Sequence, residues 1–171
     1  SSLETDCIDL SNIDLLEKKL LKNKNNIYAI ILEPFSASLS RPIDYKILLK
    51  IQEICKREDI ILIFDEVYSG FFRTSNLFYF MNESDLIPDI VTYSKSFGGG
   101  IASISGYTTK KQVFSKAYGS QRDALLHSST YSNYVEESRV ALKVLNIFSD
   151  NNFQEETNQR RNYFIDKIHE I

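Results

Sequence analysis

The chain has 171 residues, and 20 lysines and arginines against 23 aspartates and glutamates give a formal net charge of −3. A hydrophobic fraction of 43% and a charged fraction of 25% are typical of a folded domain, which excludes a disordered chain, and without a basic excess nucleic acid is not expected as a partner. Two cysteines are too few for a disulfide framework, and the longest apolar runs are far shorter than the roughly 20 residues of a membrane-spanning helix.

Hydrophobic spacing divides the chain into alternating helices and strands. Apolar residues that recur every three or four positions predict amphipathic helices, and short continuous apolar runs predict buried strands. In chain order we expect a helix capped by Ser11, a strand at residues 27–32, a loop at 36–42, a helix at 44–59, strands at 60–64, 90–93 and 102–108, and helices at 134–148 and 153–171.

This order of elements predicts an α/β fold. Strands that are apolar along their whole length and alternate with helices indicate a mostly parallel sheet flanked by helices on both faces. In such sheets ligands bind beyond the carboxyl ends of the strands. Three of the expected strands end in turn on Glu33, Asp65 and Lys95, so we expect these ionisable side chains at one edge of the sheet.

Asp65 is a carboxylate at the end of a buried strand, where it needs a positive partner. The simplest interpretation is a residue that caps the next turn or pairs with an arginine. A second is the acidic residue of a Walker B strand, which organises Mg²⁺ for a nucleotide. That ATPase hypothesis needs a phosphate-binding loop of the form G-x-x-x-x-G-K-[ST], which this sequence lacks.

Lys95 stands between an apolar strand and the glycines at positions 98–100. A lone lysine in this position usually reaches solvent, but a buried lysine loses its proton readily and forms Schiff bases with carbonyl cofactors. Pyridoxal phosphate needs such a lysine together with a carboxylate at its pyridine nitrogen. Lys95 and Asp65 supply that pair, and the glycines would let the backbone pass close to the cofactor.

Four segments resemble the motifs of the class III, omega-type aminotransferases, which use pyridoxal phosphate. They are Ile-Ile-Leu-Glu-Pro at 30–34, Asp-Glu-Val-Tyr-Ser-Gly-Phe-Phe-Arg-Thr at 65–74, Pro-Asp-Ile-Val-Thr-Tyr-Ser-Lys-Ser-Phe-Gly-Gly-Gly at 88–100, and His-Ser-Ser-Thr-Tyr at 127–131. Their order and approximate spacing match the family, and the resemblance runs from about residue 8 to the end. It implies the large domain of a fold-type-I pyridoxal-phosphate transferase.

The resemblance also implies a role for each matching residue. Lys95 would bond to the cofactor aldehyde and move a proton between substrate and cofactor, Asp65 would bind the pyridine nitrogen, and Val67 would pack on one face of the ring. Tyr68 stands where many relatives have a glutamine near the ring hydroxyl. Thr130 would contact the cofactor phosphate in the neighbouring subunit's site, across a homodimer interface.

Other residues receive simpler interpretations. By the resemblance, Glu33 matches an acidic residue near the substrate site, and Arg73 would help to orient a loop there. Glu66 is interpreted as structural, turned away from the ring by strand alternation, and Cys55 as a buried, unreactive thiol. His127 is interpreted as a loop histidine, and since the chain has 2 histidines no metal site is expected.

The implied reaction moves an amino group from an amine or amino-acid donor to a 2-oxo acid, in a cytoplasmic homodimer that binds neither nucleic acid nor a membrane. The alternatives are an aminomutase or decarboxylase of the same family and a non-catalytic remnant of the fold. Phe72 and Ser75 replace glycines that are usual in the family, and residues 132–135 replace its Gly-Asn-Pro run. We therefore expect the substrate loop and the dimer contacts to differ from those of relatives.

Class III enzymes are typically more than twice as long as this chain. Their upstream phosphate-binding turn, their aromatic residue that stacks on the cofactor and their downstream small domain are not recognisable here. Residues 1–150 would be the central part of the large domain, and residues 151–171 a helix that leads toward the small domain. We therefore expect this chain alone to bind the cofactor weakly and to be inactive.

Overall fold

The structure is a computed structural model, and it describes residues 5–170 apart from 8, 11, 75, 124, 125, 129 and 131–133. The α-helices are α1 (Ile13–Asn23), α2 (Tyr45–Arg57), α3 (Lys111–Tyr118), α4 (Val135–Phe148) and α5 (Asn151–His169), and the short 3-10 helices are η1 (Lys24–Asn26), η2 (Tyr79–Asn82) and η3 (Lys95–Gly98). The strands are β1 (Ala29–Leu32), β2 (Phe35–Ser36), β3 (Arg41–Pro42), β4 (Ile61–Asp65), β5 (Ile90–Tyr93) and β6 (Gly106–Thr109).

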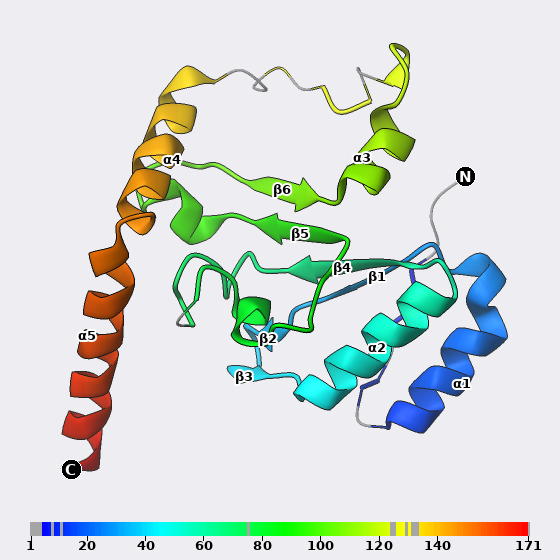
Figure 1. Cartoon of the computed structure of the whole chain (residues 1–171), viewed down its shortest axis with the longest axis horizontal. Coiled ribbons are helices and arrows are strands. Elements are labelled where there is room, and N and C mark those ends of the chain that lie inside the picture. The colour runs from blue at the N-terminus through cyan, green and yellow to red at the C-terminus, as the bar shows by residue number, and fades with distance from the viewer. Residues whose placement is uncertain are drawn as a thin grey trace.

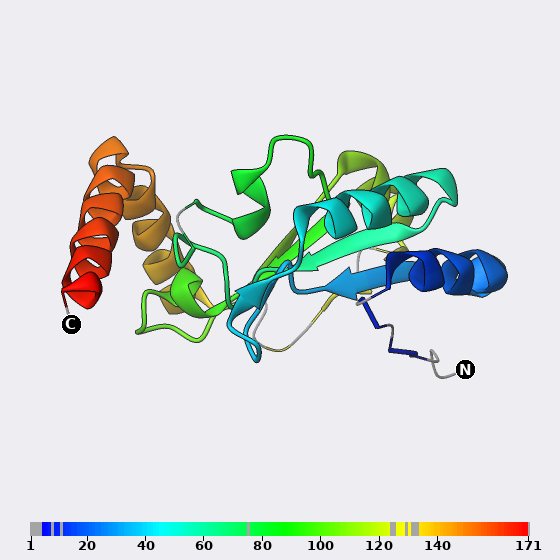
Figure 2. The same cartoon turned by 90° about the horizontal axis from the view of Figure 1, so that it is seen from below.

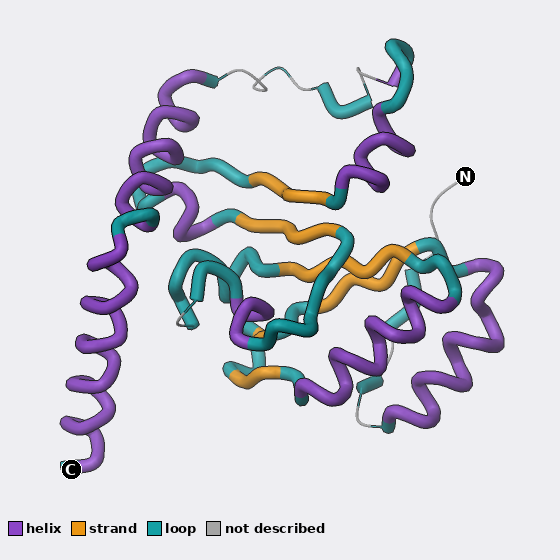
Figure 3. The backbone as a smooth tube through the Cα atoms, in the orientation of Figure 1, coloured by secondary structure: helices purple, strands orange, loops and turns teal. Residues whose placement is uncertain are grey.

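The main sheet has the strand order β1-β4-β5-β6 (Figures 1 and 3). β1 pairs with β4, and β4 with β5, in parallel, whereas β6 runs antiparallel to β5. A second, small antiparallel pair joins β2 to β3 just beyond the end of β1. The prediction of a mostly parallel α/β sheet is therefore confirmed, and the three parallel strands end at the same edge.

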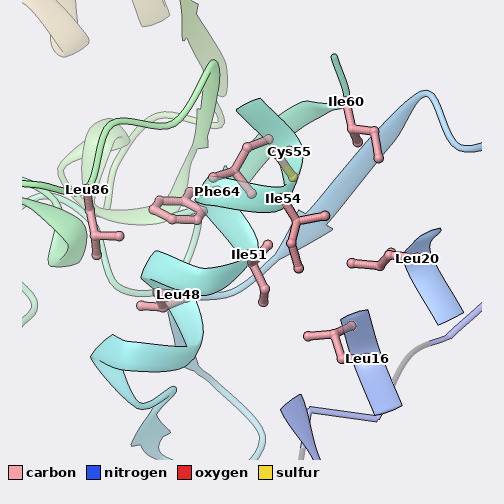
Figure 4. Close-up of a cluster of buried hydrophobic side chains, with 10 residues drawn as sticks. Leu16, Leu20, Leu48, Ile51, Ile54, Cys55, Ile60, Phe64 and Leu86 are labelled. Carbon is pink, nitrogen blue, oxygen red and sulfur yellow. The ribbon is translucent and has the colours of Figure 1, made fainter. Parts of the chain in front are cut away.

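The hydrophobic core lies between the sheet and the pair of helices α1 and α2 (Figure 4). Alternation along β4 turns Leu62 and Phe64 toward these helices, and both side chains are fully buried. The buried residues of this core are Leu16, Leu20, Leu48, Ile51, Ile54, Cys55, Ile60, Leu62, Phe64 and Leu86. This core holds β4 in place, and with it the residue that ends the strand, Asp65.

Among the described residues, the two faces of β1 are covered to different extents. Ile31 is 61% exposed, on the face turned away from α2. The cause is the handedness of parallel connections, because right-handed crossovers that step in one direction across a sheet lie on the same face. The connection from β4 to β5 accordingly contributes Phe80 and Leu86 to the core beside α2, and Figure 2 shows η2 and α2 on the same side of the sheet.

Several short elements differ from the expectation. The predicted loop at residues 36–42 contains β3 and the end of β2, and its turn includes Ser40 at φ 50°. The helix α3 was not predicted; it is only 8 residues long, and none of its residues is buried. The predicted cap Ser11 lies outside the described residues, and Asn12 caps α1 through its Oδ1, which accepts from Leu15 N at 3.0 Å.

The end of the chain is helical, as expected. Asp150 caps α5 because its Oδ1 accepts from Asn152 N at 3.0 Å, so the helix begins two residues before its predicted start at 153. No helix in the described part of the chain combines the length and apolarity needed to cross a membrane. The division at residue 150 between a large-domain core and a connecting helix stays a prediction.

The two cysteines differ in accessibility, and this gives a direct test of the core. Cys55 is 2% exposed, and burial, with a smaller contribution from Asp89, raises the pKa of its thiol to about 12, whereas Cys7 is exposed. Since the thiolate is the reactive form, we expect a chromogenic thiol reagent at pH 8 to label one cysteine in the folded chain and both in denaturant. Rapid labelling of both thiols in the folded protein would contradict the described core.

Candidate active site

The predicted site residues Glu33, Asp65 and Lys95 lie at one edge of the sheet. Leu32 is in register with Phe64, and Asp65 with Thr92, so the chain leaves β1, β4 and β5 at nearly the same level. Glu33 directly follows β1, Asp65 ends β4, and Lys95 follows β5 by two residues. The expected gathering at the carboxyl edge is therefore present, beside η3 and the β2–β3 pair (Figure 1).

Lys95 has an uncommon backbone conformation. It opens η3 at φ 46°, a left-handed conformation that destabilises an ordinary residue by roughly 1 kcal/mol. The neighbouring backbone is fixed because Ser94 Oγ donates to Ile104 O at 2.9 Å. Such strain persists where surrounding contacts enforce it, and it concentrates at functional sites.

The glycines after Lys95 provide close packing. Gly99 has φ 61°, and a Cβ built on it would lie 2.7 Å from Val144 Cγ2 of α4. A larger residue at position 99 would be strained at this φ and would force the Val144 side chain to move. The glycine turn therefore brings α4 against the segment that begins with Lys95.

Asp65 is half-buried and its carboxylate is oriented by the turn that follows. Its Oδ1 accepts from Val67 N at 3.0 Å. Among the described residues, no partner occupies the second carboxylate oxygen. Asp65 thus presents a negative charge, fixed in direction, on the strand next to the one that leads to Lys95.

Tyr68 joins two of the predicted residues into one cluster. The Lys95 Nζ lies 5.8 Å from the centroid of the Tyr68 ring, and the Arg73 Cζ lies 5.7 Å from it. The ring also stacks on Phe35 at a centroid distance of 6.2 Å. Both distances are within the roughly 6 Å over which a ring quadrupole attracts a cation. Phe35 was missed as a site residue, and its only sequence signal is its position directly after Pro34.

Glu33 and Thr130 are less directly connected to this cluster. Glu33 Oε2 accepts from Ala37 N at 2.8 Å, so the carboxylate supports the turn between β2 and β3. Thr130 is exposed in the segment between α3 and α4. No contact of the described residues joins either of them to Lys95. Residues 129 and 131 of the same motif lie outside the described residues, and the roles of Glu33 and Thr130 stay predictions.

His127 lies outside the cluster, as interpreted from the sequence. Its Nδ1 is 3.5 Å from the hydroxyl of Tyr118, and that hydroxyl is 2.9 Å from the hydroxyl of Tyr107. This is a local hydrogen-bonded contact of a loop histidine. Among the described residues, no contact joins His127 to Asp65 or Lys95.

Glu66 is fully buried on the opposite side of the strand end from Asp65. Its carboxylate accepts hydrogen bonds from Ser69 Oγ, Tyr79 N and Phe80 N. Burial raises the pKa of Glu66, and these three donors act in the opposite direction. The interpretation of Glu66 as a structural residue is confirmed.

Phe71 and Phe72 precede Arg73 and both have left-handed backbones, with φ of 55° and 62°. Phe72 stands where the resemblance expects glycine. The centroid of its ring lies 5.4 Å from that of Phe148 and 5.3 Å from that of Phe153. These ring contacts tie the loop that carries Arg73 to the junction of α4 and α5. The second replaced glycine, at Ser75, lies outside the described residues.

The strain at Phe72 can be measured by comparing two truncations. Both Phe72→Ala and Phe72→Gly lose the ring contacts, but alanine keeps a Cβ in the left-handed conformation, so we expect Phe72→Ala to be less stable by about 1 kcal/mol. Urea unfolding measures the difference in free energy of unfolding. At Lys116, an exposed position inside α3, the same two substitutions should rank in the opposite order, with glycine less stable. Equal ranking at both positions would contradict the strain at Phe72.

Comparisons with known proteins agree with this arrangement. The family model described as aminotransferase class-III matches residues 4–171. The succinylornithine transaminase of Salmonella paratyphi B is 32% identical over 148 residues, which cover 86% of this chain and 35% of that enzyme. This chain therefore spans about a third of the length of the curated relatives it matches.

Solved structures show the same fold. The acetylornithine aminotransferase of Elizabethkingia anophelis matches with a TM-score of 0.79 and 27% identity, over 95% of this chain and 39% of that one. A thermostable (S)-enantioselective omega-transaminase from Thermomicrobium roseum matches with a TM-score of 0.71 and 29% identity, over 80% of this chain and 30% of that one. Because the family model matches residues 4–171, nearly the whole of this chain, the chain belongs to the class III aminotransferase family.

Proposed function

We propose that the protein containing this chain is a pyridoxal-phosphate-dependent transaminase, and that Lys95 and Asp65 bind the cofactor. The observation that carries the proposal is the placement of a lysine and an oriented carboxylate at the ends of two adjacent parallel strands. Class III aminotransferases depend on pyridoxal phosphate, and this chain belongs to that family.

The residues present suit the two reactive ends of that cofactor. When bound, pyridoxal phosphate supplies an electron sink for the bonds of the substrate's amine-bearing carbon. Asp65 would accept a hydrogen bond from the protonated ring nitrogen through its free oxygen and hold that proton in place. The Lys95 amine would bond to the aldehyde carbon and, once released, would take and return a proton at its Nζ.

Tyr68 and Arg73 would shape the surroundings of Lys95. The Tyr68 ring attracts the Lys95 ammonium from 5.8 Å, so it restricts the directions in which the lysine can extend. Val67 would pack on the cofactor ring, and its amide already orients Asp65. Arg73, exposed beside Tyr68, would bind a carboxylate of the substrate.

The relatives suggest which substrates to test first. Their names are succinylornithine transaminase and acetylornithine aminotransferase, so the first donor class is an amino-acid derivative with an amine at the end of its side chain, with a 2-oxo acid as acceptor. These names favour amino-group transfer over an aminomutase or a decarboxylase, and the family assignment disfavours the ATPase hypothesis for Asp65. A cytoplasmic homodimer, in which Thr130 and Glu33 complete the sites, belongs to the same proposal.

The test uses the natural protein that contains this chain, supplied with pyridoxal phosphate. We expect a visible absorbance band of lysine-bound cofactor, loss of that band when an amine donor is added, and its return with a 2-oxo acid and release of an amino acid. A loaded protein with neither the band nor any product across a screen of terminal amines would overturn the proposal. The chain of residues 1–171 alone should bind the cofactor more weakly and show no turnover.

A further inference from the structure

The loop from Glu66 to Phe80 leaves the strand of Asp65, carries Tyr68 and Arg73, and returns to the same strand end. Glu66 lies at its start and is fully buried. Its Oε2 accepts from Ser69 Oγ at 2.5 Å and from Tyr79 N at 3.0 Å, and its Oε1 accepts from Phe80 N at 3.0 Å. One carboxylate thereby holds both ends of the loop.

The backbone of Glu66 makes two further connections. Its N–H donates to Thr92 O of β5 at 3.0 Å, and its carbonyl accepts from Gly70 N at 2.9 Å. A Cβ on Gly70 would lie 2.7 Å from that carbonyl oxygen, so this close turn requires glycine. Residue 66 thus links the strand of Asp65, the strand that leads to Lys95, and the loop.

Tyr68 is held between these fixed points. It lies two residues from Glu66 and one residue from Ser69, and its ring faces the Lys95 Nζ at 5.8 Å. The loop's far end also contributes, because Tyr79 contacts Phe35 at 5.6 Å, and Phe35 stacks on Tyr68. A displacement of the loop would therefore move Tyr68 relative to Lys95 and would release the Val67 amide from Asp65.

Only a carboxylate satisfies this arrangement completely. Three donors converge on two oxygens in a place that water does not reach, and a buried donor without an acceptor is strongly unfavourable. A glutamine at position 66 would offer one acceptor oxygen and turn an NH₂ group toward a donor. An alanine would leave all three donors without an acceptor.

We propose that Glu66 is a positioning residue of the cofactor site, which fixes Asp65 and Tyr68 relative to Lys95 without touching the cofactor itself. This inference rests on the proposed function, and it adds a second acidic residue with a different task from that of Asp65. In metal sites, mutating a residue that orients a metal ligand without touching the metal weakens metal binding by roughly 10- to 100-fold. We expect loss of Glu66 to weaken cofactor binding on a similar scale.

The experiment compares Glu66→Gln, Glu66→Ala and Ser69→Ala with the wild type in the natural protein that contains the chain. The matched control is Leu20→Ala. Leu20 is a fully buried residue of α1, so its truncation destabilises the hydrophobic core, and it lies far along the chain from the site. The readouts are the dissociation constant of pyridoxal phosphate, the visible circular dichroism of the bound cofactor, and hydrogen exchange of residues 65–68, 79–80 and 93–98 without cofactor.

We expect Glu66→Ala to weaken cofactor binding about 10-fold or more, to change the circular dichroism, and to speed exchange at all three segments, with Glu66→Gln and Ser69→Ala intermediate. Leu20→Ala should leave the dissociation constant and the spectrum unchanged at temperatures where it is folded. Should Glu66→Ala fail to fold, the two milder variants decide the matter in the same way.

Faster exchange at residues 79–80 alone, with unchanged cofactor binding and unchanged exchange at 65–68 and 93–98, would overturn the positioning role. A wild-type protein without a Lys95-dependent absorbance band would instead contradict the proposed function. In that case exchange at 65–68 and 93–98 still decides whether Glu66 fixes these two segments.

Discussion

Lys95→Ala is expected to abolish the absorbance of lysine-bound cofactor and to lower the rate of amino transfer by about 10⁴- to 10⁶-fold, the scale found when a nucleophile or its base is removed from a catalytic unit. The reason is that one amine is assigned both tasks, bonding to the aldehyde carbon and carrying the proton. Lys95 is exposed, and alanine keeps its left-handed backbone, so the folded state should retain nearly its full stability. Absorbance spectra and single-turnover rates measure the effect, and thermal unfolding confirms that the variant is folded.

The matched control for this substitution is Lys111→Ala. Lys111 is also exposed, and it begins α3, on the chain beyond β6. The control should keep the absorbance band and the rate within a factor of about two, since a surface substitution away from a site has little effect. If Lys95→Ala kept the absorbance band and turned over like the control, Lys95 would not be the residue that bonds to the cofactor.

The position of Lys95 and Asp65 at one edge of the sheet could be predicted from the sequence because it depends on short-range patterns. Each residue lies at or just beyond the end of a short, mostly apolar run that indicates a buried strand, and parallel strands bring their carboxyl ends to one edge. Neither inference needs knowledge of how the loops fold. The same patterns correctly placed Glu66 on the other side of the strand end from Asp65.

The contacts around this pair could not be predicted, because they join residues whose separation follows no period. Glu66 bonds to amides 13 and 14 residues further along the chain, and Phe35 reaches Tyr68 across two loops. The left-handed backbones of Phe71 and Phe72 run against local preference, which is why a sequence pattern does not reveal them. Tertiary packing of their rings on neighbouring aromatic residues decides these conformations.

Which face of β1 is covered is a second feature that the sequence pattern did not predict. A continuous apolar run indicates a strand, but it does not show what covers each face. Ile31 is apolar and 61% exposed in the described structure, since the connections that follow β1 and β4 both lie on the face of α2. The handedness of the crossovers, and not the composition of the strand, decides which face is covered.

Asp65→Asn should separate the charge of this residue from its shape. The asparagine side-chain oxygen can still accept from Val67 N, so the turn after β4 is expected to keep its form. What is lost is the negative charge that would hold a proton on the cofactor ring nitrogen. Removing one preorganised electrostatic partner typically lowers the catalytic rate by about 10²- to 10³-fold, and we expect a loss of this size in kcat with a smaller change in KM.

Asp89→Asn provides a control of matched chemistry at the opposite edge of the sheet. Asp89 is also oriented by a backbone amide, because Leu62 N donates to its Oδ2 at 3.0 Å, and it pairs with Lys110 at 2.8 Å. Its neutralisation should cost up to about 1 kcal/mol of stability through the weakened, partly exposed ion pair, and leave cofactor binding and kcat unchanged. If both variants lost activity equally, the effect would come from the stability of the sheet. A fall in kcat confined to Asp65→Asn would place the required charge at the end of β4, next to the strand of Lys95.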